Sequence, residues 1–311
     1  MNDRRRVRLA VASLVMLSAA AVPSQAQVEA PSRLTLTWEN DLFAGTDRHY
    51  TSGLRIELAG RLDPRALPTW LRGDEAEWGL SVGQRIYTPE RLDEAALIAD
   101  DRPYAGWSYL ALSVTRRGSS LAWEDRLELT LGVVGPASGA QATHELAHDL
   151  FRSEAPRGWR HQLRDEPTIS LGYRASAQLA RGEVGGVEYD LRPLFAVSLG
   201  NVSTFGAVGA TARIGVGVPG HDPRPVPFRL YLTASAEVRL VGYDVLLDGN
   251  LIRAGSHRVA KETITANLSV GLVLAVRDSV SLSYMHTIAM PQFEAQAEAD
   301  QFGSIELTFR W

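Results

Sequence analysis

Apolar and polar residues alternate one by one through many segments of this chain, and this pattern constrains the fold more than any other feature. Residues 304–311, SIELTFRW, place an apolar side chain at every second position, and residues 34–39 and 127–133 do the same. Successive side chains of a β-strand point to opposite faces, so each segment predicts a strand with one apolar and one polar face. We therefore predict an all-β chain of about twelve strands, near residues 33–43, 51–61, 77–87, 105–117, 123–134, 167–180, 189–201, 206–217, 227–243, 258–276, 279–288 and 302–311.

Strands of this kind fit two architectures. In a soluble β-sandwich the apolar faces pack together, whereas in an outer-membrane barrel they face lipid and the polar faces line the interior. An even number of strands and a last strand that ends on the aromatic Trp311 favour the barrel. We predict an outer-membrane antiparallel β-barrel of about 12 strands, and a soluble periplasmic sandwich remains the alternative.

The first 26 residues have the pattern of a secretory signal peptide. Arginines at positions 4, 5, 6 and 8 precede an apolar run at 9–22, and Ser24, Gln25 and Ala26 form a small-residue cleavage region. The apolar run is shorter than the roughly 20 residues that a membrane-spanning helix needs. We predict cleavage after Ala26, a barrel formed by residues 27–311, and export to the bacterial cell outer membrane.

Composition excludes several classes of function. The chain has no cysteine, so thiol nucleophiles and cysteine-ligated metals are excluded. Its 32 Lys and Arg against 36 Asp and Glu give a formal net charge of −4. A surface without excess positive charge does not favour nucleic acid as a partner. Any catalysis must use oxygen or nitrogen groups.

One connection between strands, 135–167, is long and contains a helical segment. If the amino terminus is periplasmic, this connection lies at the cell exterior with those at 42–50 and 88–104. We predict a helix near 140–151, opened by Ser138 with Gln141 in a capping box. His144 and His148 are four residues apart and therefore share one face of this helix.

The predicted topology brings further polar residues to the same exterior end. They come from several loops and strand ends, which is typical of a site built on a rigid barrel. These residues are Asn40 and Asp41 after the first strand, Tyr50, Thr51 and Ser52 at the start of the second, Arg85 late in the third, Arg102 before the fourth, and the two helix histidines.

The string His144-Glu145-Leu146-Ala147-His148 also matches H-E-x-x-H, the zinc-binding helix of metalloproteases. Such a site needs a third ligand, and Glu166, 18 residues beyond His148, has a suitable residue type and spacing. However, the loop is too short to build a protease domain around the helix. Zinc proteolysis and a purely structural helix remain less favoured alternatives.

Several blocks of sequence, in order along residues 38–167, resemble the lipid A 3-O-deacylase family of outer-membrane barrels. Each block is weak alone, and their specificity comes from the combination. The blocks are WENDLF at 38–43, TDRHYTSG at 46–53, YTP at 87–89, DRPYAGW at 101–107, Gly135-Pro136 leading to His148, Gly158-Trp159, Gln162-Leu163 and Asp165-Glu166-Pro167.

The resemblance implies a twelve-stranded barrel that uses calcium to remove the 3-O-linked acyl group of lipid A in the outer leaflet. His148 would be the general base, with Asn40, Asp41 and Thr51 forming the calcium and substrate region and Asn40 and Asp41 ligating Ca²⁺. His144 occupies a position where the family has glutamine, and Arg85 is assigned to the family's strand-3 lysine.

On the same resemblance, lipid A or lipopolysaccharide is the substrate, contacted by His144, Arg102 and Tyr50. Outer-membrane lipids are the other partners, and we expect a monomer. The chemistry is coherent, because a histidine with a pKa near 6.5 can activate water and a hard cation or an arginine can stabilise the ester oxygen.

Two further classes of function remain open at this stage. One is a non-enzymatic outer-membrane barrel, either a channel or a structural protein. The other is an outer-membrane phospholipase with a serine nucleophile, which would need a histidine and a serine together at the barrel rim.

Overall fold

The computed structural model describes residues 28–46, 48–119, 122–152, 155–220 and 226–311. The predicted signal peptide, residues 1–26, lies outside this part of the chain. The described residues form thirteen strands: β1 (Arg33–Asn40), β2 (His49–Leu62), β3 (Glu75–Thr88), β4 (Ala105–Gly118), β5 (Trp123–Val134), β6 (Glu166–Ser176), β7 (Ala180–Val184), β8 (Val187–Gly200), β9 (Ser203–Val216), β10 (Phe228–Asp244), β11 (Ile264–Val276), β12 (Val280–Ala289) and β13 (Asp300–Arg310).

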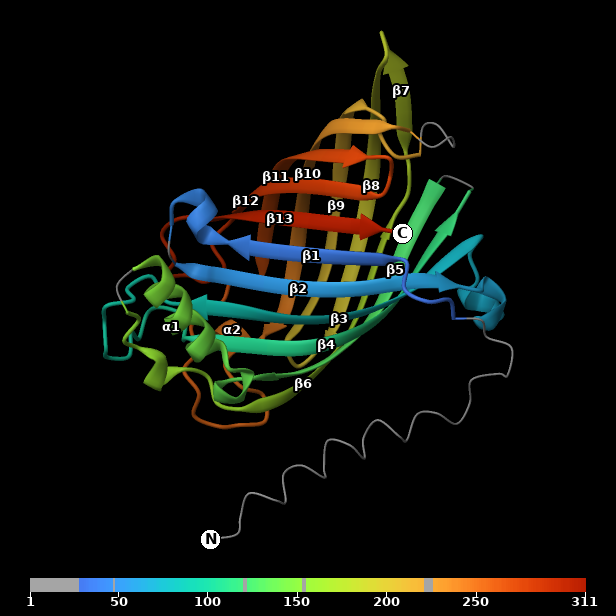
Figure 1. Ribbon diagram of the computed structural model, residues 1–311. Helices are drawn as coiled ribbons and strands as arrows, with labels where there is room; N and C mark the ends of the chain where they lie inside the picture. Colours follow the sequence, from blue (N-terminus) through green and yellow to red (C-terminus); the bar gives the residue numbers. More distant parts are fainter. Residues whose placement is uncertain (1–27, 47, 120–121, 153–154, 221–225) are drawn as a thin grey trace.

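Twelve of these strands form a closed antiparallel barrel (Figure 1). Each strand pairs with its neighbour in sequence, β1 pairs with β13, and β6 pairs with β8, which closes the ring. The thirteenth strand, β7, pairs only with the end of β8 and extends it as a hairpin beyond the barrel wall (Figure 1). The prediction of a barrel of about twelve strands is confirmed, and the soluble sandwich is wrong.

The strand limits differ from the prediction in several places, among them the end of β6 at Ser176 rather than at residue 180 and the start of β9 at Ser203 rather than at residue 206. The first strand ends at Asn40 rather than at residue 43, because η1 (Asp41–Ala44), a 3₁₀ helix, follows it. The predicted strand 258–276 begins only at Ile264. The β7 hairpin was not predicted, because the five residues of β7, ARGEV, form a non-polar face of only alanine, glycine and valine, which is too weak a pattern to mark a strand.

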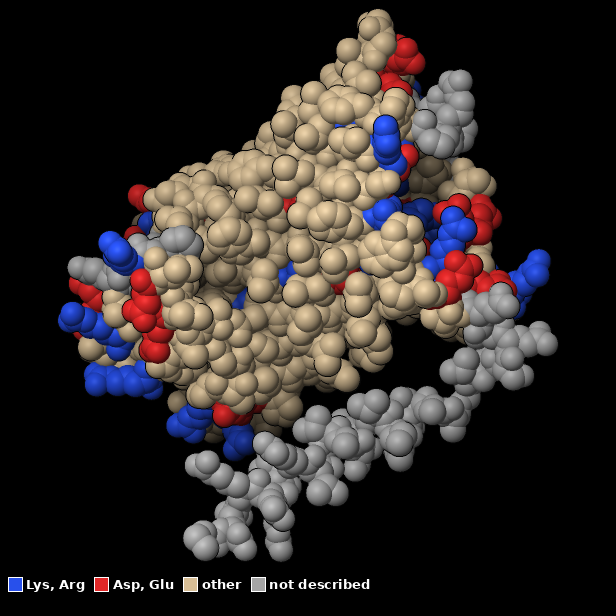
Figure 2. Space-filling model, in the orientation of Figure 1, with Lys and Arg blue, Asp and Glu red and all other residues tan. Residues whose placement is uncertain are grey.

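The barrel wall is apolar outside and charged inside. Leu54, Ile56 and Leu58 of β2 are exposed on the outer face, whereas Glu57 points inward and pairs with three arginines, among them Arg126. Figure 2 shows the result as a wall almost without charged atoms between two charged ends. An outward apolar band and a polar interior are what a membrane barrel requires.

The connections differ strongly between the two ends of the barrel. The end that carries residues 41–48, 89–104, 135–165, 245–263 and 290–299 is called the loop end here. It contains both α-helices of the described residues, α1 (Ala140–Phe151) and α2 (Val245–Asp248). Neither helix is long and apolar enough to cross a membrane, nor is any other described one.

The connections also contain short 3₁₀ helices. Besides η1, these are η2 (Pro64–Ala66), η3 (Thr69–Leu71), η5 (Pro136–Ser138) and η6 (Trp159–His161).

Buried apolar side chains concentrate at the loop end. The apolar side chains of the barrel wall point outward and are therefore not buried within the protein. One cluster joins strand ends to α2 through Val134, Leu163 and Val245. A second cluster, Ile86, Tyr104, Ala140 and Trp159, lies between the wall and the start of α1. These two clusters fix the long loop against the barrel and so position the residues described next.

Candidate active site

A pocket of about 330 Å³ lies between α1 and the outer face of the barrel wall. Helix α1 packs against β3 and β4 at the loop end (Figure 1). We call this the wall pocket. Its lining residues are Trp38, Asn40, Asp41, Leu42, Thr51, Ser52, Leu54, Gln84, Ile86, Thr143, His144, Ala147 and His148. Six polar residues that the sequence analysis placed at this end therefore share one site: Asn40, Asp41, Thr51, Ser52, His144 and His148.

Asn40 and Asp41 are held where β1 gives way to η1. The Asn40 Oδ1 atom accepts the Leu42 N–H at 2.8 Å and so caps η1, as a helix-capping asparagine does. Asp41 is only 2% exposed, and its Oδ2 accepts the backbone N–H of Arg48 at 2.7 Å. The local chain thus orients one carboxylate and one amide into the pocket.

A register shift in β2 brings two consecutive hydroxyls into the wall pocket. Tyr50 pairs with Tyr87 and Ser52 with Ile86, so Thr51 is the extra residue of a bulge. Without the bulge, alternation would turn either Thr51 or Ser52 into the barrel lumen. Instead both line the wall pocket, and Thr51 is fixed by a 2.8 Å hydrogen bond between its hydroxyl and that of Thr88.

Helix α1 has the predicted limits, but the predicted capping box is wrong. The N-cap is Gly139, with φ of 71°, and Gln141 donates to Glu145 instead of closing a box. The helix start is held by Gln84, which donates to the Ser138 carbonyl at 2.8 Å. Gly106 permits this close approach, since a Cβ there would lie 2.1 Å from the Ala140 Cβ.

The two histidines of α1 are directly hydrogen-bonded. The Nε2 atoms of His144 and His148 are 2.9 Å apart, and Trp159 Nε1 donates to His144 Nδ1 at 3.2 Å. Both histidines are buried. Burial, and after it the neighbouring His148, lowers the pKa of His144 to about 3. His144 is therefore neutral at physiological pH.

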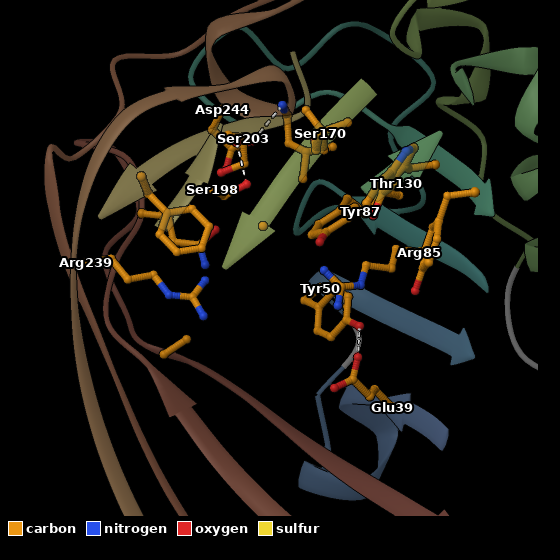
Figure 3. Close-up of a pocket in the computed structure, with 18 of the residues that line it drawn as sticks. Glu39, Tyr50, Arg85, Tyr87, Thr130, Ser170, Ser198, Ser203, Arg239 and Asp244 are labelled. Atoms are coloured by element: carbon orange, nitrogen blue, oxygen red, sulfur yellow. Dashed lines mark hydrogen bonds between the residues drawn. The ribbon is translucent and has the colours of Figure 1, made fainter. Parts of the chain in front are cut away.

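Arg85 and Tyr50 do not reach the wall pocket, which corrects their predicted placement. Both line a second pocket of about 360 Å³ inside the barrel, called the lumen pocket here (Figure 3). Tyr50 donates its hydroxyl hydrogen to Glu39. Gln84, adjacent to Arg85, faces the wall pocket because side chains alternate along β3. Sequence reasoning missed Gln84, although the parity of the strand could have indicated it.

Arg102 is also outside the wall pocket. It is 1% exposed, donates to Gln292 Oε1 at 2.7 Å, and lies against the rings of Tyr87 and Phe293. The structure thus places Arg102 away from the wall pocket, and its predicted contact with substrate stays a prediction. Among the described residues, no lysine or arginine lines the wall pocket.

The zinc-protease alternative does not find its ligands in this arrangement. Glu145 is exposed and bonded to Gln141. Glu166 is fully buried elsewhere, where it accepts hydrogen bonds from Asn201 and from the backbone of residues 251 and 252. Within the described part of the chain, no three His, Asp or Glu side chains are grouped to hold a metal.

Comparison with known proteins identifies the family. A family model described as "Outer membrane protein LpxR" matches residues 9–311. The chain belongs to the LpxR family. The resemblance seen in the sequence is thereby confirmed, and the chain is an outer-membrane β-barrel. No curated protein sequence matches it.

The solved structure of a family member supports the same fold. LpxR from Salmonella typhimurium superposes with a TM-score of 0.75 at 19% identity, covering 90% of this chain and 100% of that one. The β-domain of the Bordetella autotransporter BrkA gives a TM-score of 0.49 at 10% identity, with 91% of this chain and 100% of that one covered. At 19% identity the likeness to LpxR from Salmonella typhimurium concerns the fold alone, and the likeness to BrkA is too weak to support a conclusion.

The wall pocket offers calcium the kind of donor that it prefers. Oxygen atoms of Asn40, Asp41 and Thr51 line the site, and Ca²⁺ is bound by carboxylate, amide carbonyl and hydroxyl oxygens. The Leu42 N–H that Asn40 Oδ1 accepts leaves a further lone pair on that oxygen. One carboxylate alone is a weak site, so substrate or water oxygens would have to complete the coordination.

Proposed function

We propose that this protein is a calcium-dependent hydrolase that removes the 3-O-linked acyl group of lipid A in the outer leaflet, with water activated by His148. The observation that carries the proposal is the position of the histidine pair in a pocket on the outer, lipid-facing side of the wall. A lipid substrate reaches such a pocket directly from the membrane, with the loop end facing the cell exterior. Membership of the LpxR family supports it.

The wall pocket has an apolar part and a polar part, as a lipid ester requires. Trp38, Leu54 and Ile86 come from the outer faces of three adjacent strands, so they continue the lipid-facing band of the wall. We infer that an acyl chain packs on these side chains. Its ester group would then lie against the histidines and the oxygen atoms of Asn40 and Asp41.

The proposed reaction needs no covalent enzyme intermediate. His148 accepts a proton from water while the water oxygen bonds to the ester carbonyl carbon. The tetrahedral species then breaks its bond to the 3-oxygen of the sugar, and His148 returns the proton to that oxygen. The products are a free hydroxy fatty acid and the 3-hydroxyl of lipid A. Calcium, when bound, would supply positive charge to stabilise the oxyanion.

Two exposed arginines of the loop that carries α1 are candidates for binding lipid A phosphates. Arg152 ends α1 and Arg157 follows it, and among the described residues neither has an ion pair. Arg48 is less suitable, because it is already paired with Glu90 at 2.6 Å and Glu298 at 2.7 Å. Guanidinium groups bind phosphate through paired hydrogen bonds, so unpaired ones are favoured.

Mass spectrometry of lipid A incubated with the refolded protein tests the proposal, with calcium, with a chelator and with His148→Ala. We expect calcium-dependent loss of one hydroxyacyl chain, reduced about a hundredfold or more in the variant, since a general base contributes roughly 10²–10⁴-fold. His161→Ala is the matched control, because His161 lies in the same loop but outside the pocket. Intact lipid A under every condition would reject the proposal.

Ser52 lies in the wall pocket with both histidines, so the serine-nucleophile alternative needs its own test. We expect Ser52→Ala to retain turnover, whereas a serine hydrolase would lose it. A channel would instead show single-channel conductance in planar bilayers. The enzyme proposal predicts lipid A deacylation by a protein that shows no such conductance.

A further inference from the structure

A chain of three buried side chains runs from the loop core into the wall pocket. Trp159, which is 2% exposed, donates its indole N–H to His144 Nδ1 at 3.2 Å. His144 Nε2 then lies 2.9 Å from His148 Nε2. The ring of Trp159 is held in turn by Tyr104, with ring centres 4.9 Å apart.

The direction of this chain follows from the chemistry of its first member. An indole nitrogen can only donate, so His144 Nδ1 must accept and cannot carry a proton. A neutral His144 then carries its proton on Nε2. The low pKa of His144 keeps it neutral. Because two N–H groups cannot hydrogen-bond to each other, His148 Nε2 must be the acceptor.

We propose that Trp159 and His144 are positioning residues that set the tautomer of His148, keeping its lone pair on Nε2 and its proton on Nδ1. The inference deepens the proposed function and rests on it, because it names the nitrogen of the general base that receives the proton of water. In the other tautomer Nε2 would carry a proton and could not act as base. When substrate binds, the attacking water replaces His144 as the donor to Nε2.

The first test is spectroscopic and independent of activity. Long-range ¹H–¹⁵N correlation of the ¹⁵N-histidine-labelled barrel in detergent resolves the ring tautomers of its seven histidines. Spectra of His144→Gln and His148→Ala assign the two signals. We expect His144 protonated on Nε2 and neutral His148 protonated on Nδ1. A proton on Nδ1 of His144, or on Nε2 of neutral His148, would overturn the inference.

The second test compares three variants by lipid A deacylation. His144→Gln retains an N–H donor, so its kcat should stay within about threefold of the wild-type value. His144→Phe keeps a planar ring without a donor, so kcat should fall roughly tenfold or more with KM little changed, since the tautomer and not the contact is lost. Trp159→Phe removes the indole N–H but keeps an aromatic ring, and its kcat should lie between those of the two His144 variants.

His161→Gln serves as the control for substitution of a loop histidine outside the pocket. If both His144→Phe and His144→Gln kept the kcat of the wild type, the positioning role would be rejected. If both lost kcat to the same extent, the imidazole itself and not its N–H would be required, and the positioning role would be rejected as well. If the wild type deacylates no lipid A, the proposed function fails, while the tautomers still decide whether the hydrogen-bond chain exists.

Discussion

The wall pocket and the lumen pocket are lined by alternate residues of the same strands, yet they have opposite chemistry. Gln84 faces the wall pocket and Arg85 the lumen, and Asn40 and Glu39 divide in the same way. Figure 3 shows Arg85 and Arg239 pointing into the lumen pocket from opposite sides. In a barrel, one step along a strand separates a nearly uncharged lipid-facing site from a charged interior.

The polar side chains of the two pockets are also held in place by different partners. In the lumen, Arg55 and Arg126 are satisfied by Glu57 and Glu128. In the wall pocket the polar groups are instead oriented by backbone N–H groups and by the packing of α1 against the barrel wall. The wall pocket therefore depends on α1 and its loop, whereas the ion pairs of the lumen join side chains of the strands themselves.

The largest expected effect comes from moving α1 away from the wall while the barrel stays intact. Gly106→Ala would place a Cβ 2.1 Å from Ala140 Cβ and 2.2 Å from Ser138 Oγ, so α1 must move away from the wall. Activity should fall about a hundredfold, the effect that a displacement of roughly 1 Å can have. Circular dichroism should show an unchanged barrel. Gly172→Ala, whose Cβ would meet nothing closer than 3.9 Å, is the control. Full activity in Gly106→Ala would contradict the assignment of the pocket.

Removal of the single carboxylate tests the proposed calcium site. Asp41→Ala should raise the calcium concentration needed for half-maximal activity by about tenfold or more, because lost coordination weakens metal affinity by such factors. Calcium titration of deacylation measures it. Asp149→Asn, an exposed acid on α1, should leave the titration unchanged. A titration unaltered in Asp41→Ala would exclude Asp41 as a ligand.

Adjacent residues of β3 test the division between wall and lumen directly. Gln84→Leu removes a hydrogen bond to the Ser138 carbonyl that contributes about 1 kcal/mol, so kcat/KM should fall several-fold. Arg85→Gln changes only the lumen pocket, and its kcat/KM should remain within about twofold. Steady-state kinetics of both variants measure kcat/KM. A larger loss of kcat/KM in Arg85→Gln than in Gln84→Leu would show that Arg85 takes part in the reaction.

The smallest effect concerns acid stability of the loops. Burial alone would raise the pKa of Asp101, but hydrogen bonds from His49 and from the N–H groups of Glu90 and Arg102 hold it below the ordinary value of 3.8. This stabilisation is complete above that ordinary value and disappears as pH falls through the folded pKa. Thermal melts from about pH 6 to about pH 2 should therefore fall more steeply for the wild type than for Asp101→Asn. Parallel curves would contradict the assignment.

Much of the fold was predictable because alternation is a local property. The apolar band of β2 or β13 is present in the sequence itself, and lipid on one side and water on the other convert it into a barrel wall. Helix α1 was also predictable in its limits. Its N-cap was not, because Gly139 reaches φ of 71° only where Gln84 and Gly106 hold the helix start against the wall.

The candidate site was predicted only in part. Asn40, Asp41, Thr51 and the two histidines meet as expected, since strand ends and one loop at the same end of a barrel must be neighbours. The structure places Tyr50, Arg85 and Arg102 outside the wall pocket, which is a difference in the direction of the side chains rather than in their location along the chain. Sequence position gives the end of the barrel, but the side depends on register and on the bulge at Thr51.

The sequence by itself thus determined the all-β architecture, the family and the polar residues gathered at one end, because each follows from local pattern or from motif. Only the tertiary structure decided which of those residues share a pocket and how Trp159 directs the hydrogen bond between His144 and His148. The physical reason is that a hydrogen bond depends on contacts within about 3 Å between segments far apart in the chain, and no local pattern encodes that distance.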